Sequence, residues 1–199
     1  SIMLTVDVSR SMLIEDFYIG GQPVNRLTAA KRVMADFIKG RRSDRIGIVA
    51  FAGETYLPCP LTLDRDWLIN NLDRVQTQRV GDGTAIGSGI ASAANRMRRE
   101  KTPSKVIVLL TDGANNSGRL SPQDAAKLAA TLGIKIYTIA IGTPGIHSIP
   151  DPRRGTFTPV GQQLFDEKTL QEVAGIGNGQ FYMAQNLSSL SDVFATIDK

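Results

Sequence analysis

The sequence contains little of the chemistry on which most enzymes and many metal sites depend. Cys59 is the one cysteine and His147 the one histidine among 199 residues. A lone cysteine excludes an internal disulfide and any metal site that needs several cysteines. The lone histidine is set in a stretch rich in proline and glycine and has no second histidine or cysteine with which to bind zinc. No combination of nucleophile, general base and orienting group is evident either. The sequence therefore predicts a protein that is not an enzyme.

Two further shortages limit the partners and the setting of the chain. Aromatic residues make up 6% of it, and the net charge of +4 comes from scattered lysines and arginines. Nucleic-acid binding needs a basic stripe with stacking aromatics, so we expect none. No apolar run approaches the roughly 18 to 20 residues that cross a bilayer, and no signal peptide is evident. Because Ser1 is followed at once by an apolar strand, residues 1–199 are interpreted as a single domain taken from a longer protein.

Short apolar runs alternate with segments in which apolar residues recur at helical spacing. Buried parallel strands are typically continuous apolar runs, and such runs occupy residues 2–8, 45–51, 106–111 and 134–141, with a weaker one at 180–183. Helical spacing predicts helices over residues 27–38, 86–97, 125–132, 167–174 and 187–197. Strands that alternate with helices predict an α/β fold of the Rossmann-like, doubly wound type, with a mostly parallel central sheet covered by helices on both faces.

Two of the apolar strands deliver an aspartate at their carboxyl ends, and three hydroxyls accompany these carboxylates. The candidate ligands are Asp7, Ser9, Ser11, Thr84 and Asp112. Ligands of open α/β sheets sit beyond the carboxyl ends of the strands, so we expect these loops to meet at one rim. Oxygen ligands alone suit a hard divalent cation such as Mg²⁺, or Mn²⁺ or Ca²⁺. Two carboxylates leave the cation short of a ligand, and its open position can accept a carboxylate from another molecule.

Two other segments depart from the regular alternation. Residues 55–57 are predicted to form a short antiparallel edge strand, because Pro58 and Pro60 cannot donate to a strand ladder. Residues 142–163 contain four prolines and predict either a long loop or a small hairpin on the rim that carries the candidate ligands. Long structured loops are often functional.

The candidate ligands also carry a family resemblance. Three motifs together resemble the metal-ion-dependent adhesion site of von Willebrand factor A domains. They are Asp-x-Ser-x-Ser after the first strand, an isolated threonine, and Thr-Asp-Gly after a central strand. Further segments resemble the bacterial BatA group of aerotolerance-related membrane proteins, and the likeness covers nearly the whole chain. These segments are Asn25–Lys31, Asp44–Gly53, Cys59–Thr62, Asp82–Gly87 and Leu109–Gly113.

The resemblance implies a role for each candidate ligand and a setting for the protein. By the family pattern, Ser9 and Ser11 bind the cation directly, Thr84 does so in an open state, Asp7 acts through water, and Asp112 acts directly or through water. Movement of the Thr84 loop and of the last helix would switch affinity. The implied function is a metal-dependent interaction module that binds an acidic side chain of a protein partner. The implied parent is a bacterial membrane-anchored scaffold with the domain on the periplasmic face, and other A-domain proteins and a MoxR-type AAA+ ATPase are its implied partners.

Two other functions remain as alternatives, and one residue departs from the family pattern. A Mg²⁺-dependent phosphatase or hydrolase needs a second carboxylate two residues after the first, where this chain has Ser9, and the phosphate-binding Gly-x-x-x-x-Gly-Lys-Ser/Thr loop is absent. A purely structural domain stabilised by its metal would lose melting temperature with chelator rather than a partner. Arg10 stands between the two serines where many relatives have glycine. Its guanidinium either opposes metal binding or helps to hold an acidic partner, depending on where it points.

Overall fold

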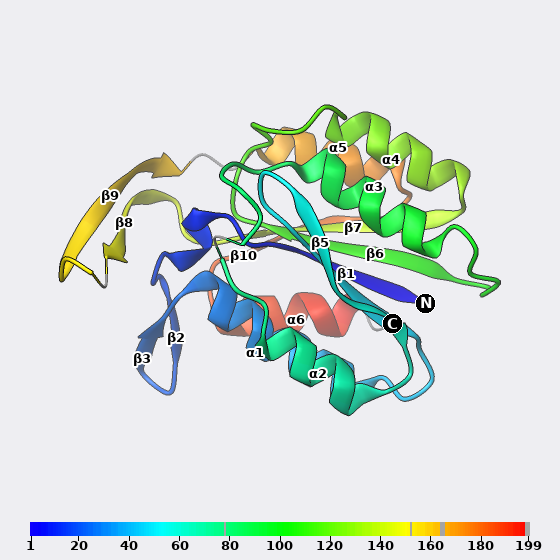
Figure 1. Cartoon of the computed structure of the whole chain (residues 1–199), viewed down its shortest axis with the longest axis horizontal. Helices are drawn as coiled ribbons and strands as arrows, with labels where there is room; N and C mark the ends of the chain where they lie inside the picture. Colours follow the sequence, from blue (N-terminus) through cyan, green and yellow to red (C-terminus); the bar gives the residue numbers. More distant parts are fainter. Residues whose placement is uncertain (78, 152, 164–165, 198–199) are drawn as a thin grey trace.

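A computed structural model describes residues 1–77, 79–151, 153–163 and 166–197. Its centre is a six-stranded sheet in the order β10-β7-β6-β1-β4-β5 (Figure 1). The parallel strands are β1 (Ile2–Asp7), β4 (Ile46–Phe51), β6 (Lys105–Thr111), β7 (Ile134–Ile141) and β10 (Phe181–Ala184). Every residue of β1 and β4 is buried, as expected for strands covered on both faces. The predicted doubly wound α/β fold is confirmed.

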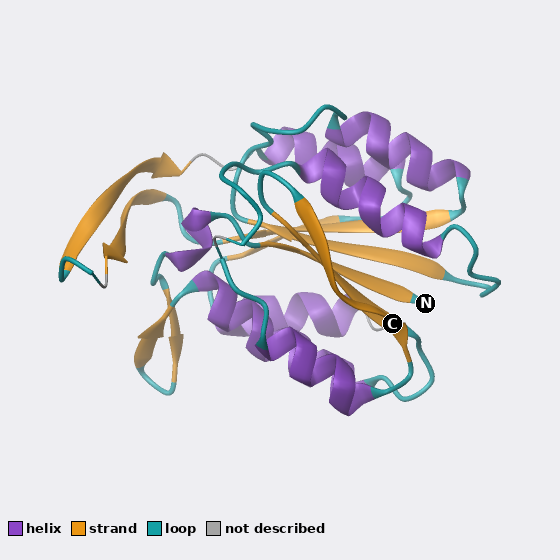
Figure 2. Ribbon diagram, in the orientation of Figure 1, coloured by secondary structure: helices purple, strands orange, loops and turns teal. Residues whose placement is uncertain are grey.

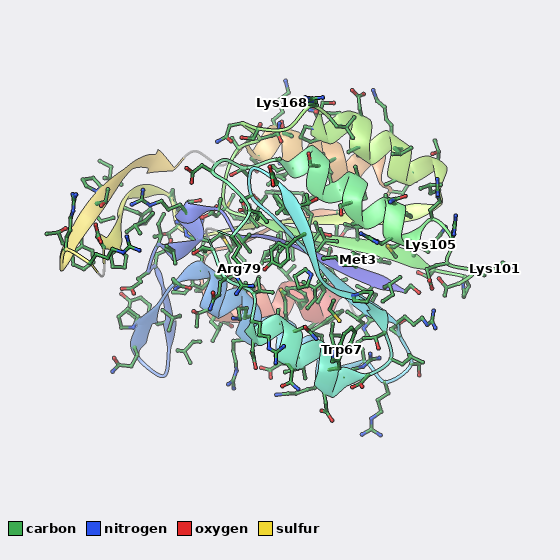
Figure 3. The ribbon with its side chains drawn as sticks, in the orientation of Figure 1. Met3, Trp67, Arg79, Lys101, Lys105 and Lys168 are labelled. Atoms are coloured by element: carbon green, nitrogen blue, oxygen red, sulfur yellow. The ribbon has the colours of Figure 1, made fainter. Side chains whose placement is uncertain are left out.

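Helices form one layer on each face of the sheet (Figure 2). One face carries α1 (Arg26–Gly40), α2 (Arg65–Asp73) and α6 (Leu187–Ile197), and the other carries α3 (Ile86–Met97), α4 (Pro122–Thr131) and α5 (Glu167–Ile176). Alternate residues of β1 divide between the two layers: Leu4 and Val6 join the core under α1 and α6, and Met3, labelled in Figure 3, joins the core under α3 and α4. The helices therefore hold the central strand from both sides.

Local capping explains where several of these helices begin. The Asn25 side chain accepts a hydrogen bond from the Thr28 amide at the start of α1, at 2.8 Å. Asp64 caps α2 and Ser121 caps α4 in the same way, and Pro122 occupies the first turn of α4. Such caps satisfy amides that have no partner within the helix. The cap at Asn25 places the following residue, Arg26, at the first position of α1.

The edge strand is longer than the sequence predicted. β5 (Thr55–Thr62) pairs antiparallel with β4 and continues through Pro58 and Pro60, so the expectation of a short strand over residues 55–57 is wrong. Register shifts in the β4–β5 pairing flank the pair Ile48 and Cys59. Prolines are tolerated on an edge strand and at such irregularities because the missing amide leaves no buried acceptor without a partner.

Two hairpins and a short 3₁₀ turn lie at the carboxyl edge of the sheet. The turn is η1 (Arg10–Leu13), and the small hairpin consists of β2 (Phe17–Ile19) and β3 (Gln22–Val24). The larger one consists of β8 (Gly145–Asp151) and β9 (Thr156–Gln163) and projects from the body at the left of Figure 1. The hairpin alternative for residues 142–163 is thus confirmed.

The chain ends lie at the opposite end of the molecule from the β8–β9 hairpin. Figure 1 shows the first residue of β1 and the end of α6 far from this hairpin, and Figure 3 places Lys101 and Lys105 at that same distant end. Among the described residues, no helix combines the length and apolar character needed to cross a membrane. The carboxyl edge of the sheet is therefore the edge remote from both termini.

Candidate metal centre

The candidate site lies where the strand order of the sheet reverses. From β1 the chain first proceeds to β4 and β5 on one side, and only later to β6, β7 and β10 on the other. The crevice between β1 and β6 is therefore the switch point at which open α/β sheets bind ligands. Asp7 is the last residue of β1, and Asp112 directly follows β6. Both carboxylates are fully buried at this crevice.

Asp7 is held by hydrogen bonds to both of its carboxylate oxygens. The Ser9 amide donates to Oδ1 at 2.8 Å, and the Thr111 hydroxyl donates to Oδ2 at 2.6 Å. Thr111 reaches Asp7 because the β1–β6 register pairs Val6 with Leu110, which puts the next residue of each strand side by side. These bonds fix the carboxylate in one orientation at the end of the strand.

The two predicted serine ligands meet Asp112 in a single cluster. The Ser9 and Ser11 hydroxyl oxygens are 3.1 Å apart, and the Ser11 hydroxyl donates to Asp112 Oδ1 at 2.7 Å. The turn η1 brings the two hydroxyls together, since its backbone folds back with the Met12 amide bonded to the Ser9 carbonyl. Four of the five predicted ligands therefore belong to one group of oxygen atoms.

Thr84, the fifth predicted ligand, stands on a loop tied to the segment after β6. Its amide donates to Asn116 Oδ1 at 2.8 Å, and its carbonyl accepts from the Asn116 amide at 3.0 Å. A β-carbon placed on Gly113 would lie 3.7 Å from the Thr84 hydroxyl oxygen, which puts this hydroxyl beside the turn after Asp112. Within the described part of the chain, the Thr84 hydroxyl forms no hydrogen bond of its own.

A second asparagine secures the start of the adjoining helix. Ala85 caps α3 without a side-chain hydrogen bond, and the Ile86 amide is instead satisfied by Asn115 Oδ1 at 2.9 Å. Gly83 in the same loop has a positive φ of 101°, and a side chain there would collide with the Ser117 hydroxyl. Sequence reasoning did not find Asn115 and Asn116, because their partners are backbone amides about thirty residues away.

Arg26 is the largest departure from the predicted site. Its side chain is fully buried, and its guanidinium donates to Asp112 Oδ2 at 3.0 Å and to Asp16 through Nε and Nη2 at 2.6–3.1 Å. Asp16 also accepts from the amide and the hydroxyl of Thr143, both at 2.9 Å. A signal was present in the sequence, since Arg26 precedes Ala30 by four residues and Val33 by seven. It therefore lies on the buried stripe of α1.

The pKa values of the three buried aspartates shift in different directions. Burial raises the pKa of Asp7, against the hydrogen bonds from Ser9 and Thr111. Burial and the charge of Asp7 raise the pKa of Asp112 to about 7, although Arg26 acts in the opposite direction. Burial would also raise the pKa of Asp16, but the hydrogen bonds from Arg26 and Thr143 and the charge of Arg26 bring it below its usual value. The Arg26–Asp16 pair is thus ionised, while the carboxylates of Asp7 and Asp112 repel each other.

The residues present fit a divalent cation. When Asp7, Asp16 and Asp112 are all ionised, these three carboxylates and the Arg26 guanidinium leave two negative charges, which one such cation would neutralise. Every group in the cluster of Asp7, Ser9, Ser11 and Asp112 presents oxygen, the donor that Mg²⁺, Mn²⁺ and Ca²⁺ prefer. In the described ranges, no three histidine, cysteine, aspartate or glutamate side chains gather as a conventional metal cluster. The site therefore depends on hydroxyls as well as carboxylates.

Arg10 does not enter the oxygen cluster. Its side chain is exposed and lines a groove between η1 and the β8–β9 hairpin. Whether this guanidinium opposes metal binding or helps to hold an acidic partner stays an open prediction.

The fold and this site define the class of the protein. The model of the von Willebrand factor type A domain family matches residues 1–196, and the chain belongs to this family. Two solved structures are similar over 99% of this chain and 96% of theirs. An aerotolerance-related membrane protein from Bacteroides fragilis is 28% identical with a TM-score of 0.82. BatB from Bacteroides thetaiotaomicron is 26% identical with a TM-score of 0.86.

A curated relative and a more distant structure extend these comparisons. An uncharacterized protein of Borreliella burgdorferi is 33% identical over 187 residues, which are 91% of this chain and 52% of that protein. The chain thus spans about half the length of this relative. A mussel byssus protein, proximal thread matrix protein 1 with a zinc-occupied metal-ion-dependent adhesion site, shares the fold at 22% identity and a TM-score of 0.70. The match covers 98% of this chain and 44% of that one.

Proposed function

We propose that this domain is a metal-dependent protein-interaction module. A divalent cation, Mg²⁺ or in its place Mn²⁺ or Ca²⁺, would be held by Asp7, Ser9, Ser11, Thr84 and Asp112. The bound cation would then accept an aspartate or glutamate side chain of a protein partner. The observation that carries this proposal is the oxygen cluster at the strand switch point, in which two serine hydroxyls join two fully buried carboxylates.

The balance of neutral and charged ligands supports a binding role. Hydroxyls donate electron pairs without neutralising the cation, so the cation keeps affinity for one more carboxylate, which would bind through a charge-assisted contact. Asp7 is tied to Ser9 and Thr111 and stays in place as the partner enters. Asp112 keeps one oxygen toward Ser11 and the other on Arg26. The hydrogen bonds of the chain itself therefore orient the carboxylates of Asp7 and Asp112 for the cation.

We further propose the setting in which this module works. The similar structure from Bacteroides fragilis is described as a membrane protein, which supports a membrane-associated parent. In this proposal residues 1–199 form one domain of a longer membrane-anchored bacterial protein, a scaffold that faces the periplasm. Other A-domain proteins and a MoxR-type AAA+ ATPase are its proposed associates. The position of the site at the edge remote from both chain ends supports access for such partners.

Calorimetric titration with Mg²⁺ and Mn²⁺ tests the metal site. The native domain should show saturable binding, and Asp7→Ala and Thr84→Val should abolish or strongly weaken it. Asp82→Ala, which removes an exposed carboxylate two residues from Thr84, should leave it unchanged. Circular dichroism of each variant separates lost ligands from lost folding. Equal binding by all four proteins, or no binding by the native domain, would contradict the proposal.

A chelator experiment separates an interaction module from a structural metal site. EDTA should release a bound partner while the domain stays folded at room temperature. A large loss of melting temperature with no effect on any partner would instead show a cation that only stabilises the fold.

A further inference from the structure

A groove runs beside the candidate metal centre, between η1 and the β8–β9 hairpin. We call it the η1 groove, and its lining residues are Arg10, Leu13, Asn25, Thr77, Ile149, Pro150, Asp151 and Arg153. It adjoins the metal centre directly, because Arg10 stands in the chain between Ser9 and Ser11, and Asn25 precedes Arg26. A chain segment whose acidic side chain reached the metal would continue into this groove.

The hairpin wall of the groove is anchored to the buried network beneath the metal centre. His147 Nε2 lies 2.8 Å from the Thr143 carbonyl oxygen, and the Thr143 amide and hydroxyl bind Asp16. Alternation along β8 turns Ile149 inward, where only 4% of it is exposed. The groove is therefore a preformed feature of the fold, with one wall fixed to the same Asp16 that pairs with Arg26.

The charges of the groove are asymmetric. Arg10 lies on the η1 wall and Arg153 on the hairpin wall, and both are exposed. The one carboxylate among the lining residues, Asp151, already accepts a hydrogen bond from the Arg153 amide at 3.0 Å, which closes the hairpin turn. The half-buried side chains of Leu13 and Pro150 add apolar surface to the same groove. This combination suits an extended peptide that carries an acidic side chain and small apolar contacts.

We propose that the η1 groove binds an extended segment of the protein partner, with a second acidic side chain placed between Arg10 and Arg153. This inference rests on the proposed function, in which a first acidic side chain binds the metal. A cation alone would accept a carboxylate from almost any acidic protein. The groove adds selection, because only a partner with a second acid at the right spacing satisfies both sites.

A randomised peptide library displayed on phage tests this inference. The probe is a twelve-residue library selected on the Mn²⁺-saturated domain and eluted with EDTA, and selected peptides are then synthesised and titrated by calorimetry. We expect two acidic residues at a recurring spacing in the eluted peptides. Arg10→Glu and Arg153→Glu should each weaken their binding about tenfold. Arg154→Glu changes the net charge equally but removes a residue that does not line the groove, so binding should stay within twofold.

The possible outcomes separate the groove from the metal site. Mn²⁺ binding retained or strengthened in Arg10→Glu and retained in Arg153→Glu, together with weakened peptide binding by both variants, supports the groove. If the selected peptides carry only one acidic residue and bind Arg10→Glu and Arg153→Glu as tightly as the native domain, the groove inference is wrong. The proposed metal-dependent function is then unaffected. If the domain binds Mn²⁺ but no peptide is eluted with EDTA, both the groove inference and the proposed interaction function are contradicted. Metal-independent binding to phosphatidylglycerol vesicles that Arg10→Glu and Arg153→Glu abolish identifies a membrane surface as the occupant and also overturns the inference.

Discussion

Arg26 Nη1 donates to Asp112 Oδ2 at 3.0 Å in the interior of the domain, where the side chains of both residues are fully buried. The other oxygen of this carboxylate accepts from Ser11. Asp112 thus turns one oxygen toward the candidate metal cluster and one toward an internal cation. Asp16 pairs with the opposite side of the same guanidinium, so the arginine charge is shared between a carboxylate at the site and one behind it.

Replacing Arg26 should destabilise the fold strongly. Arg26→Met leaves the buried carboxylates of Asp112 and Asp16 without their cation, and breaking a buried pair in this way costs about 3–5 kcal/mol. Arg32→Met, which changes an arginine on the same helix with 64% of its side chain exposed, should cost less than about 0.5 kcal/mol. Urea denaturation measures both. A loss below about 1 kcal/mol in Arg26→Met would mean that the network carries little stability.

The stability of the metal-free domain should fall as the pH rises from about 4 to 7. The pKa of Asp112 lies at about 7 in the folded chain against an ordinary value of 3.8, chiefly through burial and the charge of Asp7. A carboxyl group whose pKa is raised by folding contributes its full stabilisation at a pH below its pKa in the unfolded chain. This contribution is lost as the pH rises through its pKa in the folded chain. Saturating Mg²⁺ should flatten this dependence, since a cation favours the ionised carboxylates. Melting temperatures in EDTA and in Mg²⁺ at several pH values provide the test, and parallel curves would argue against it.

Gly142→Ala should disrupt the Arg26 network from the other side. Gly142 has a φ of +126°, and an added β-carbon would lie 2.5–2.7 Å from guanidinium atoms of Arg26. Gly145→Ala is the matched control, with a similar φ of +135° and no atom within 4 Å of the added carbon. The control should lose about 1–2 kcal/mol from backbone strain alone, and Gly142→Ala should lose clearly more. Thermal denaturation that ranks the two variants equally would show that the guanidinium moves aside without cost.

The two asparagines after β6 should have separable effects. Asn116→Ala removes the acceptor of the Thr84 amide, and loss of such a supporting contact typically weakens metal binding about tenfold or more. Asn115→Ala instead removes the acceptor of the Ile86 amide at the start of α3 and should cost about 1 kcal/mol of stability. Mn²⁺ calorimetry and urea denaturation on both variants distinguish these effects. Unchanged Mn²⁺ affinity in Asn116→Ala would mean that Thr84 needs no such support or is not a ligand.

Strong periodicity made most of the fold predictable. The strand over residues 134–141 has the predicted bounds, and β1, β4, β6 and β10 lie within a residue or so of theirs, because buried parallel strands are continuous apolar runs. The hairpin β2–β3 was not predicted, since strands of three residues carry almost no pattern. β5 was predicted too short, because proline was treated as a stop where an irregular edge strand tolerates it.

The candidate site was predictable in its residues but not in its supports. Asp7, Ser9, Ser11 and Asp112 lie in one cluster, as the strand ends indicated, and their role as metal ligands stays a prediction. Arg26 and its pairing with Asp16 were not predicted, because a charged residue at the first turn of a helix is usually solvated. Only the three-dimensional placement of Asp112 and Asp16 makes an inward-facing arginine favourable there.

The prolines of β5 also bear on how copies of this domain can meet. An exposed edge strand normally offers a row of amides and carbonyls to which a strand of another molecule can add. Pro58 and Pro60 remove two amide donors from β5, and the register shifts beside Cys59 break its regular spacing. At the opposite edge, β10 is only four residues long. Sheet extension from copy to copy is therefore disfavoured at both edges, which limits aggregation by edge-to-edge strand pairing.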